Sequence, residues 1–203
     1  TGGYAVLQHP SGTRLGQVTV VELTAAGTAR IEGRVLDEFE IRQVYGRYSR
    51  GIDRRQFELV RSCYHPDGWD EHGDFSGGVD DFISMCERSL DRYTSTQHFL
   101  GTVLIEVDGA RARGEAYAMA IHRVPAAGDK PERDHVVGLR YVDDFERRGG
   151  EWRILTRVCV FDWTRTDPVA PGWAFRDGFR MGDRAGDRGD AVFAPDLAAL
   201  LGR

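Results

Sequence analysis

Three polar residues stand in apolar, strand-like segments, where burying a charge or an imidazole requires a partner. His98 lies near the start of TSTQHFLGTVLIEV, residues 94–107, and His122 shares an alternating face with several alanines. Arg157 alternates with apolar residues in the segment 152–163. An imidazole transfers protons near neutral pH, and a guanidinium binds carboxylates or anions. These residue types could take part in proton transfer or in anion binding in a pocket.

Each of these residues also has a purely structural interpretation. A strand histidine commonly does no more than form a hydrogen bond in the wall of a sheet, and this is favoured for His98 and His122 taken alone. Arg157 could equally well pair with an acid from a helix and only brace the fold. Asp53 precedes Gln56 by three residues, as in a capping box at the start of a helix. A carboxylate there could also hold a histidine in one tautomer and keep it basic.

The segment HPDGWDEHGD, residues 65–74, is rich in potential metal ligands. Its spacing matches no zinc, EF-hand or HExxH pattern, and its glycines indicate a loop, so we expect a solvated turn with room nearby for one short strand, and no metal site. The chain also has no GxGxxG, GxxxxGK[ST] or GxSxG motif, so neither nucleotide-dependent enzymes nor serine hydrolases are indicated. The potential ligands in this segment are His65, Asp67, Asp70, Glu71, His72 and Asp74.

The composition predicts one soluble domain with a core and a tail. The chain has 203 residues, a formal net charge of -5 and no basic patch, so a small molecule is a better partner than nucleic acid or a membrane surface. No apolar stretch reaches the roughly 18 residues of a membrane span and no secretion signal is evident, which predicts a cytoplasmic protein. Cys63, Cys86 and Cys159 form no CxxC pair, and we expect them to be small core residues.

The elements that position these residues are helices first and strands afterwards. A helix is predicted from Leu36, with Gly51 as its stop. A second helix follows with Asp53 as its N-cap, and a third is capped by Asp80 and Asp81. Four strands with period 2 then cover residues 96–107, 111–124, 135–147 and 152–163. This order is typical of an α+β fold, in which a curved sheet wraps a helical face and makes a cone that can hold a ligand.

The two ends of the chain are predicted to lie outside this domain. Residues 1–34 form an extension in which QVTVVEL and TAAGTARIEG suggest a β-hairpin. Residues 35–164 form the main domain. Residues 165–203, rich in Gly, Asp and Arg, are expected to be an extended tail with a short helix at PDLAALL.

Three segments, YSRGIDRR (48–55), TQHFLG (96–101) and GEWRILTR (150–157), carry a family resemblance. In this order they resemble the SnoaL-like branch of the nuclear transport factor 2-like superfamily, and especially scytalone dehydratase, the dehydrochlorinase LinA and the bile-acid 7α-dehydratase. The resemblance covers residues 36–163. It implies an NTF2-like cone, with three helices packed on a strongly curved mixed β-sheet around a deep pocket.

The resemblance also implies roles for individual residues. Asp53 and His98 match the family's catalytic His-Asp dyad, and Tyr48 matches a pocket tyrosine. Arg157 matches an active-site arginine, and His122 lies close to a second pocket histidine. No cofactor and no metal are implied. The family further implies a homo-oligomer, with a trimer favoured over a dimer.

Together these features predict a cofactor-independent lyase that performs a dehydratase-type elimination on a small cyclic or aromatic hydroxylated metabolite. One alternative is an isomerase or cyclase of a polyketide or steroid-like substrate. Another is a noncatalytic binding or scaffold subunit, like the β subunit of ring-hydroxylating dioxygenases. Aromatic and imidazole side chains are expected to contact the substrate. They are His122, Trp69, Phe99, Tyr117, Phe161 and Trp163.

Overall fold

The computed structural model describes residues 4–8, 14–19, 25–170, 172, 175–179 and 182. The chain divides into two compact units, Thr1–Asp37 and Glu38–Arg203. No helix in the described part is long and apolar enough to cross a membrane.

The first unit contains an antiparallel hairpin of β1 (Tyr4–Gln8) and β2 (Arg14–Thr19), followed by the beginning of α1 (Ala25–Arg54). A hairpin is therefore present, but the prediction that TAAGTARIEG is its returning strand is wrong. Nearly all of this segment is helical. Its two glycines suggested a break, yet its alanines and charged residues favour a helix enough to tolerate them.

In the second unit α1 buries one face against the sheet. The buried residues recur every three or four positions, which is the helical spacing that the sequence indicated. The predicted stop at Gly51 is wrong, because the helix continues to Arg54 and ends where Arg55 adopts a positive φ of 55°. The residues of α1 that form this buried face are Ile41, Val44, Tyr45, Tyr48 and Ile52.

Gly51 has a different role, at a close helix contact. The short helix α2 (Phe57–Arg61) crosses it so closely that a Cβ on Gly51 would lie 2.7 Å from Cγ2 of Val60. Asp53 is not the N-cap of α2, since it lies in the last turn of α1. The N-cap is Gln56, whose side chain makes no capping hydrogen bond in the described chain.

The segment predicted as a turn forms a hairpin instead. β3 (Tyr64–His72) pairs antiparallel with β4 (Phe75–Gly78), and α3 (Val79–Leu90) follows directly. The N-cap of α3 is Gly78. Asp80 and Asp81 lie in the first turn instead of capping the helix, where their charges are favourable to the helix dipole.

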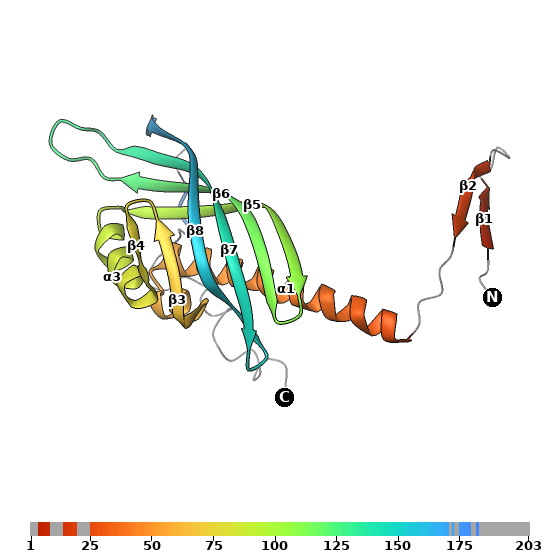
Figure 1. Ribbon diagram of the computed structural model, residues 1–203. Coiled ribbons are helices and arrows are strands. Elements are labelled where there is room, and N and C mark those ends of the chain that lie inside the picture. Colours follow the sequence, from red (N-terminus) through yellow and green to blue (C-terminus); the bar gives the residue numbers. More distant parts are fainter. Residues whose placement is uncertain are drawn as a thin grey trace. The chain divides into compact units, whose positions relative to one another are not determined.

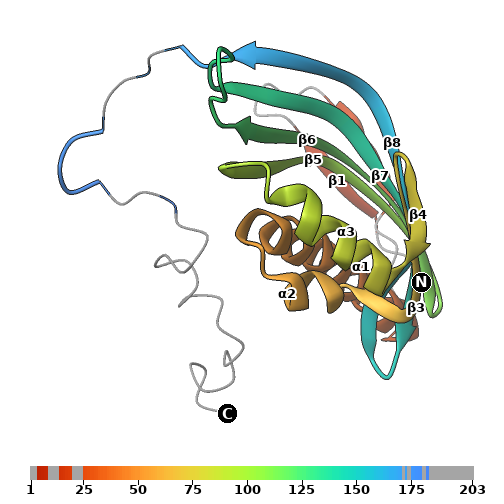
Figure 2. The same cartoon turned by 90° about the vertical axis from the view of Figure 1, so that its left-hand side faces the viewer.

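Four long strands complete a six-stranded sheet in the order β4-β3-β8-β7-β6-β5. β3 and β8 are parallel and the other neighbours are antiparallel. The sheet curves around the helices, which lie on its concave side (Figures 1 and 2). The α+β class, the curved mixed sheet and the four predicted strands are confirmed. These strands are β5 (Ser95–Asp108), β6 (Arg111–Val124), β7 (Arg133–Arg148) and β8 (Glu151–Pro168).

At the C-terminal side, β8 runs on to Pro168, into the segment predicted as a tail. The helix predicted at PDLAALL lies outside the described residues.

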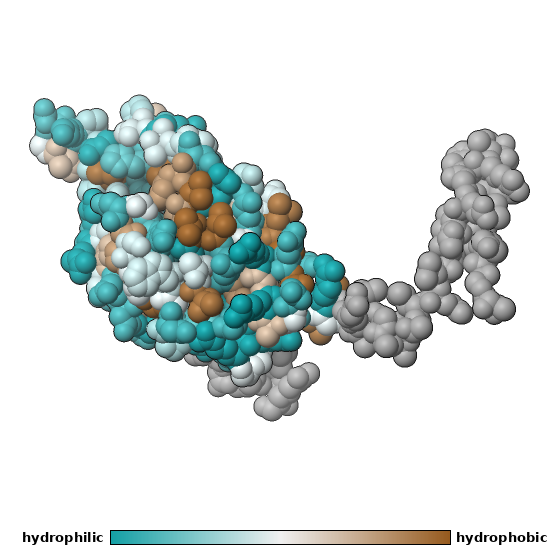
Figure 3. Space-filling view, in the orientation of Figure 1, coloured by the Kyte–Doolittle hydropathy of each residue, from teal (hydrophilic) through white to brown (hydrophobic). Residues whose placement is uncertain are grey.

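The two faces of the sheet differ in side-chain size and polarity. The inner face of β6 carries the small buried side chains of Ala116, Ala118 and Ala120. On the outer face Tyr117 is exposed, and Arg140 crosses its ring and pairs with acids on both sides. In the space-filling view hydrophobic patches are accordingly broken up by hydrophilic surface (Figure 3).

Candidate functional site

The end of α1 and the start of β5 bring together a carboxylate and an imidazole that are 45 residues apart. Oδ1 of Asp53 lies 2.7 Å from Nδ1 of His98, and Oδ2 accepts a hydrogen bond of 2.9 Å from the backbone N–H of His98. Because an ionised carboxylate only accepts, this contact assigns the proton of the neutral ring to Nδ1. The lone pair of Nε2 is then left to act as a base.

The contact is supported by a neighbouring ion pair. Arg55, two residues after Asp53, reaches the C-terminal end of α3, where its guanidinium binds Asp91 at 2.7 Å. Since α3 leads within a few residues into β5, this ion pair holds the end of α1 beside the strand that carries His98.

A second histidine lies next to the first on the adjacent strand. His98 is the register partner of Ala120, and His122 follows two positions later on β6. The two imidazole rings are 5.7 Å apart and nearly perpendicular, and the ring of Tyr93 lies 4.8 Å from that of His122. Burial, reinforced by His98, lowers the pKa of His122 to about 4. His122 is therefore neutral at pH 7 and has one ring N–H, for which the backbone of His135 is also a partner.

A buried hydroxyl completes this group. Thr96 is the register partner of His122 and lies on the same face of β5 as His98. Its Oγ1 is buried and has no hydrogen-bond partner among the described residues. A polar atom in this position requires a partner, which a bound molecule would supply.

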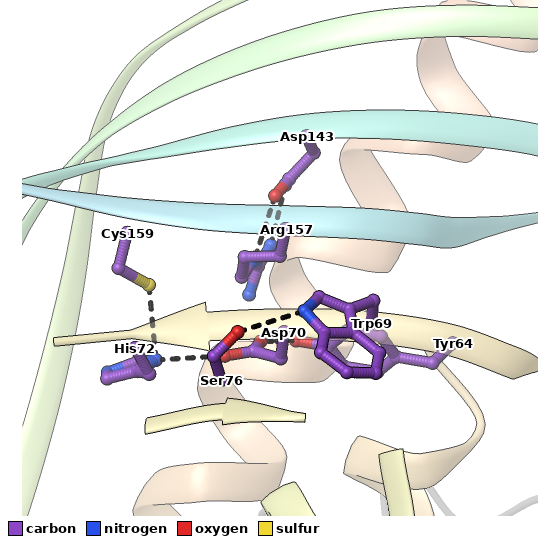
Figure 4. Close-up of polar contacts among 8 residues, drawn as sticks. All are labelled: Tyr64, Trp69, Asp70, His72, Ser76, Asp143, Arg157 and Cys159. Atoms are coloured by element: carbon purple, nitrogen blue, oxygen red, sulfur yellow. Dashed lines mark hydrogen bonds and ion pairs between the residues drawn. The ribbon is translucent and has the colours of Figure 1, made fainter. Parts of the chain in front are cut away.

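Arg157 belongs to a different part of the interior. Its guanidinium forms two hydrogen bonds, of 2.8 and 2.7 Å, with the carboxylate of Asp143, and both side chains are 0% exposed (Figure 4). The two residues are register partners on β8 and β7. The guanidinium carbon also lies 4.1 Å from the ring centre of Tyr48 and 4.2 Å from that of Tyr141, which are favourable cation–π contacts.

This arrangement favours one of the two interpretations that the sequence left open for Arg157. The arginine pairs with an acid, as the structural interpretation had it, although the acid comes from the neighbouring strand and not from a helix. Tyr48 is buried beside it, stacked on Phe82. Tyr48 therefore contacts the buried pair of Arg157 and Asp143, whereas the hydrogen bonds of Asp53 lead to His98.

The segment 65–74 is not the solvated turn that we expected, because it belongs to β3 as far as His72, and His65 and Asp70 are buried. His65 is buried and its Nε2 lies 2.8 Å from the carbonyl oxygen of Glu146. Asp70 is 0% exposed, and its Oδ2 accepts a hydrogen bond of 2.6 Å from the hydroxyl of Tyr64. A strand places residues two apart on one face, so the spacing of Asp70 and His72 was a signal that a loop assignment concealed.

Asp70 and His72 meet Cys159 of the adjacent strand. Nδ1 of His72 lies 3.4 Å from Oδ1 of Asp70 and 3.1 Å from Sγ of Cys159 (Figure 4). The possible ligand atoms of these three residues all lie within 4.8 Å of one another. All three cysteines are free and lie in the hydrophobic core as predicted, and Cys159 differs in that its sulfur also contacts His72.

The residues predicted to contact substrate are scattered. Phe99 is 61% exposed and on the opposite face of β5 from His98, and Tyr117 is on the outer face of β6, so neither lines the interior. Trp69 is exposed on β3, where it donates to Ser76, and Trp163 is exposed over Gly138. These four side chains therefore lie outside the interior in this structure, and their contact with a substrate stays a prediction. Of the others, His122 lies beside His98, and Phe161 lies beside His72.

A cavity of about 480 Å³ lies at the far end of β5 and β6, where exposed charged residues such as Glu106, Arg111 and Arg113 line it. We place the candidate site at Asp53 and His98 instead. These two titratable groups are largely buried and hydrogen-bonded to each other, as the groups of an acid–base site are.

Comparison with known proteins agrees with this fold. The family model described as a SnoaL-like domain matches residues 33–158. The uncharacterised protein Rv2910c of Mycobacterium tuberculosis is 29% identical over 127 residues, which cover 61% of this chain and 84% of that protein.

Two solved structures illustrate the likeness. A candidate scytalone dehydratase of Novosphingobium aromaticivorans is 17% identical, with a TM-score of 0.60 over 70% of this chain and 99% of that one. The hexachlorocyclohexane dehydrochlorinase LinA-type3 of Novosphingobium barchaimii is 16% identical, with a TM-score of 0.60 over 68% and 97%. At these identities the structures show the shared fold, and the family match is the stronger finding. The chain belongs to the SnoaL-like domain family.

Proposed function

We propose that the protein is a lyase that removes water from a small hydroxylated carbonyl compound, with His98 as general base and Asp53 as its orienting partner. The observation that carries the proposal is the hydrogen bonding of both carboxylate oxygens of Asp53 to His98. These hydrogen bonds fix both the orientation of the imidazole ring and its tautomer, as a general base requires. The likeness of the fold to a candidate scytalone dehydratase and to a dehydrochlorinase supports an elimination reaction.

In the first step Nε2 of His98 takes a proton from the carbon beside the carbonyl group. The electron pair of the broken C–H bond moves toward the carbonyl oxygen, which becomes an enolate oxygen. Asp53 stabilises the imidazolium that forms. Neutral His122 donates a hydrogen bond to the enolate oxygen without giving up its proton, in the way that a neutral imidazole stabilises an oxyanion.

In the second step the electron pair returns and forms a carbon–carbon double bond while the bond to the hydroxyl group breaks. The imidazolium of His98 gives its proton to the departing oxygen, so that water leaves and the dyad returns to its initial state. The reaction consumes no oxidant, reductant or external base. A single histidine therefore serves as base and then as acid.

Arg157 and Tyr48 have no contact with the reacting groups in this scheme, which differs from the roles that the resemblance implied. Arg157 is neutralised by Asp143, and both are fully buried. The pair of Arg157 and Asp143 holds β7 and β8 together beneath the aromatic residues of α1.

The test uses cyclic β-hydroxy ketones as substrates and product mass as the readout. Elimination lowers the mass by one water, whereas isomerisation or cyclisation without loss of water leaves it unchanged. We expect His98→Gln to lower turnover about 10²- to 10⁴-fold, the usual contribution of a general base. His65→Gln is the matched control, because His65 is also a buried imidazole, and the partner that its ring has in the described chain is the backbone carbonyl oxygen of Glu146.

Turnover by His98→Gln at the wild-type rate would exclude this function. A product of unchanged mass would instead support the isomerase or cyclase alternative at the same dyad. Sedimentation of the full chain tests the separate prediction of a homo-oligomer, for which we propose a trimer.

A further inference from the structure

The cluster of Asp70, His72 and Cys159 is built from two adjacent parallel strands. Asp70 pairs in register with Arg157 and Glu71 with Val158, so the next positions on the same ladder are His72 and Cys159. Alternation turns Asp70 and His72 to the same face, and neighbouring strands bring Cys159 beside them. The sheet itself therefore sets the distances between the three donor atoms.

Hydrogen bonding leaves this cluster unsatisfied. Oδ1 of Asp70 and Sγ of Cys159 both approach the same ring atom, Nδ1 of His72, at 3.4 and 3.1 Å. One ring nitrogen carries at most one proton, so it cannot form good hydrogen bonds to both neighbours at once. Oδ1 of Asp70 accepts no hydrogen bond from any described residue, although the side chain is 0% exposed. A buried carboxylate oxygen in this state costs free energy unless something else binds it.

The buried charged residues of the described chain also include one carboxylate more than they include arginines. Arg157 and Asp143 neutralise each other through two hydrogen bonds. Asp70 then remains as a second buried carboxylate, which accepts a hydrogen bond from Tyr64 and lies 3.4 Å from Nδ1 of His72. A divalent cation bound by the Asp70 carboxylate, a Cys159 thiolate and neutral His72 would make the whole group neutral. Burying charge is tolerated when it is compensated in this way.

We propose that Asp70, His72 and Cys159 bind one divalent metal ion of the zinc class. Thiolate, imidazole and carboxylate are the ligand types of tetrahedral zinc. With metal–ligand bonds of about 2.0 to 2.3 Å, the ligand atoms of a tetrahedral site lie about 3.3 to 3.8 Å apart. The two separations of 3.1 and 3.4 Å around Nδ1 are close to this range, so small side-chain movements complete the site.

The surroundings of the three residues fit a metal centre. Tyr64 donates to Oδ2 of Asp70 at 2.6 Å, which orients the carboxylate and leaves Oδ1 for the ion. The rings of Phe82 and Phe161 lie 5.7 and 5.9 Å from that of His72. The His72 side chain is 26% exposed, so an ion can enter from this side. Three protein ligands leave a fourth position for water or another small ligand.

A thiol nucleophile is the competing explanation for a Cys-His-Asp group. In such a triad the acid binds the ring nitrogen opposite the one that faces the sulfur. Here both contact Nδ1.

The experiment measures metal binding by the full chain, freed of metal with a chelator and then dialysed against Zn²⁺ or Co²⁺. We expect one ion per chain, release of protons on binding, and a thiolate-to-cobalt charge-transfer band together with the intense visible bands of tetrahedral Co²⁺. Cys159→Ser should abolish the charge-transfer band and weaken Zn²⁺ binding by at least about 100-fold, because even a lost outer-shell partner costs about 10- to 100-fold. Tyr64→Phe, which removes such a partner, should weaken it within that range.

Cys63→Ser is the matched control, since Cys63 is also a free, buried cysteine but its Sγ bonds to the backbone carbonyl oxygens of Val44 and Leu59. It should bind as the wild type does. The cobalt spectrum of the unmutated chain needs no variant, so the test stands even if a substitution impairs folding. Absence of stoichiometric binding, a cobalt spectrum without thiolate character, or full affinity in Cys159→Ser would each overturn the proposal. None of these results would bear on the His98 base, which is tested by its own variants.

Discussion

Asp53 accepts two hydrogen bonds from His98, one carboxylate oxygen from Nδ1 and the other from the backbone N–H. An asparagine has only one acceptor oxygen, so Asp53→Asn must lose one of these bonds and the charge that stabilises the imidazolium. We expect turnover to fall by about 10²- to 10⁴-fold, and the free energy of unfolding by about 1.5 to 3 kcal/mol for the lost charged hydrogen bond. Steady-state kinetics and urea denaturation measure the two effects.

The control for this substitution is Asp108→Asn, an exposed aspartate at the end of β5. It should leave turnover unchanged and alter the free energy of unfolding by no more than about 0.5 kcal/mol. If Asp53→Asn lost stability and kept its turnover, Asp53 would be a structural residue only.

The second prediction concerns the buried pair of Arg157 and Asp143. Removing one partner leaves the other as an uncompensated buried charge, so Arg157→Met and Asp143→Leu should each lower the free energy of unfolding by about 3 to 5 kcal/mol. The double variant should recover much of this loss, because two apolar side chains can replace a buried ion pair at little cost. Urea denaturation of the four proteins gives the coupling. Additive losses would show that the pair does not act as a unit.

The third prediction is a loss of stability in mild acid that depends on His122. Burial and the neighbouring His98 lower its pKa from 6.5 to about 4, although a hydrogen bond with the backbone of His135 and the charge of Asp53 act in the opposite direction. Between these values the unfolded chain binds a proton that the folded chain does not, so stability falls as the pH falls. The contribution is complete above pH 6.5 and is lost toward pH 4.

From about pH 7.5 to about pH 5 this amounts to about 2 kcal/mol. Denaturation of the wild type and His122→Gln at both pH values measures it. The variant should lose less stability than the wild type over this interval. Equal losses would show that His122 is already free to titrate in the folded protein.

The fourth prediction compares two glycines of α1. A methyl group on Gly51 would lie 2.7 Å from Cγ2 and 3.1 Å from the backbone nitrogen of Val60, whereas nothing lies within 4 Å of the same position on Gly46. Gly51→Ala should therefore destabilise the protein by about 1 to 3 kcal/mol. Gly46→Ala should stabilise it by about 0.5 to 1 kcal/mol through helix propensity. Thermal unfolding measures the stability of both variants. A stabilising effect of Gly51→Ala would mean that α2 does not pack against α1 as described.

The strands β5 to β8 were predictable because each shows a sustained period of 2 between clear turns. The hairpin of β3 and β4 was missed for the opposite reason. Gly68, Gly73 and Gly77 make its sequence look like a loop, yet Gly68 and Gly77 are places where a side chain would meet other atoms at 2.9 Å. Composition alone does not distinguish a close approach from a flexible turn.

The site could be predicted only in part, because its contacts are long-range. Nothing in the local pattern joins Asp53 to His98, and the expectation that they meet came from the family resemblance. The same resemblance placed Arg157 with them, whereas its actual partner, Asp143, lies across one strand ladder. Asp70 and His72 were assigned to a turn because their strand was not predicted, and their alignment with Cys159 requires the parallel pairing of β3 and β8.

The central claim is that Nε2 of His98 removes a proton from the carbon beside a carbonyl group. Its most direct test is deuterium incorporation at that carbon when a cyclic β-hydroxy ketone is incubated with the protein in D₂O and followed by NMR. We predict exchange or elimination with the wild type and with His65→Gln, and a loss of about 10²-fold or more with His98→Gln and Asp53→Asn. Equal rates of deuterium incorporation in all four proteins would contradict the account.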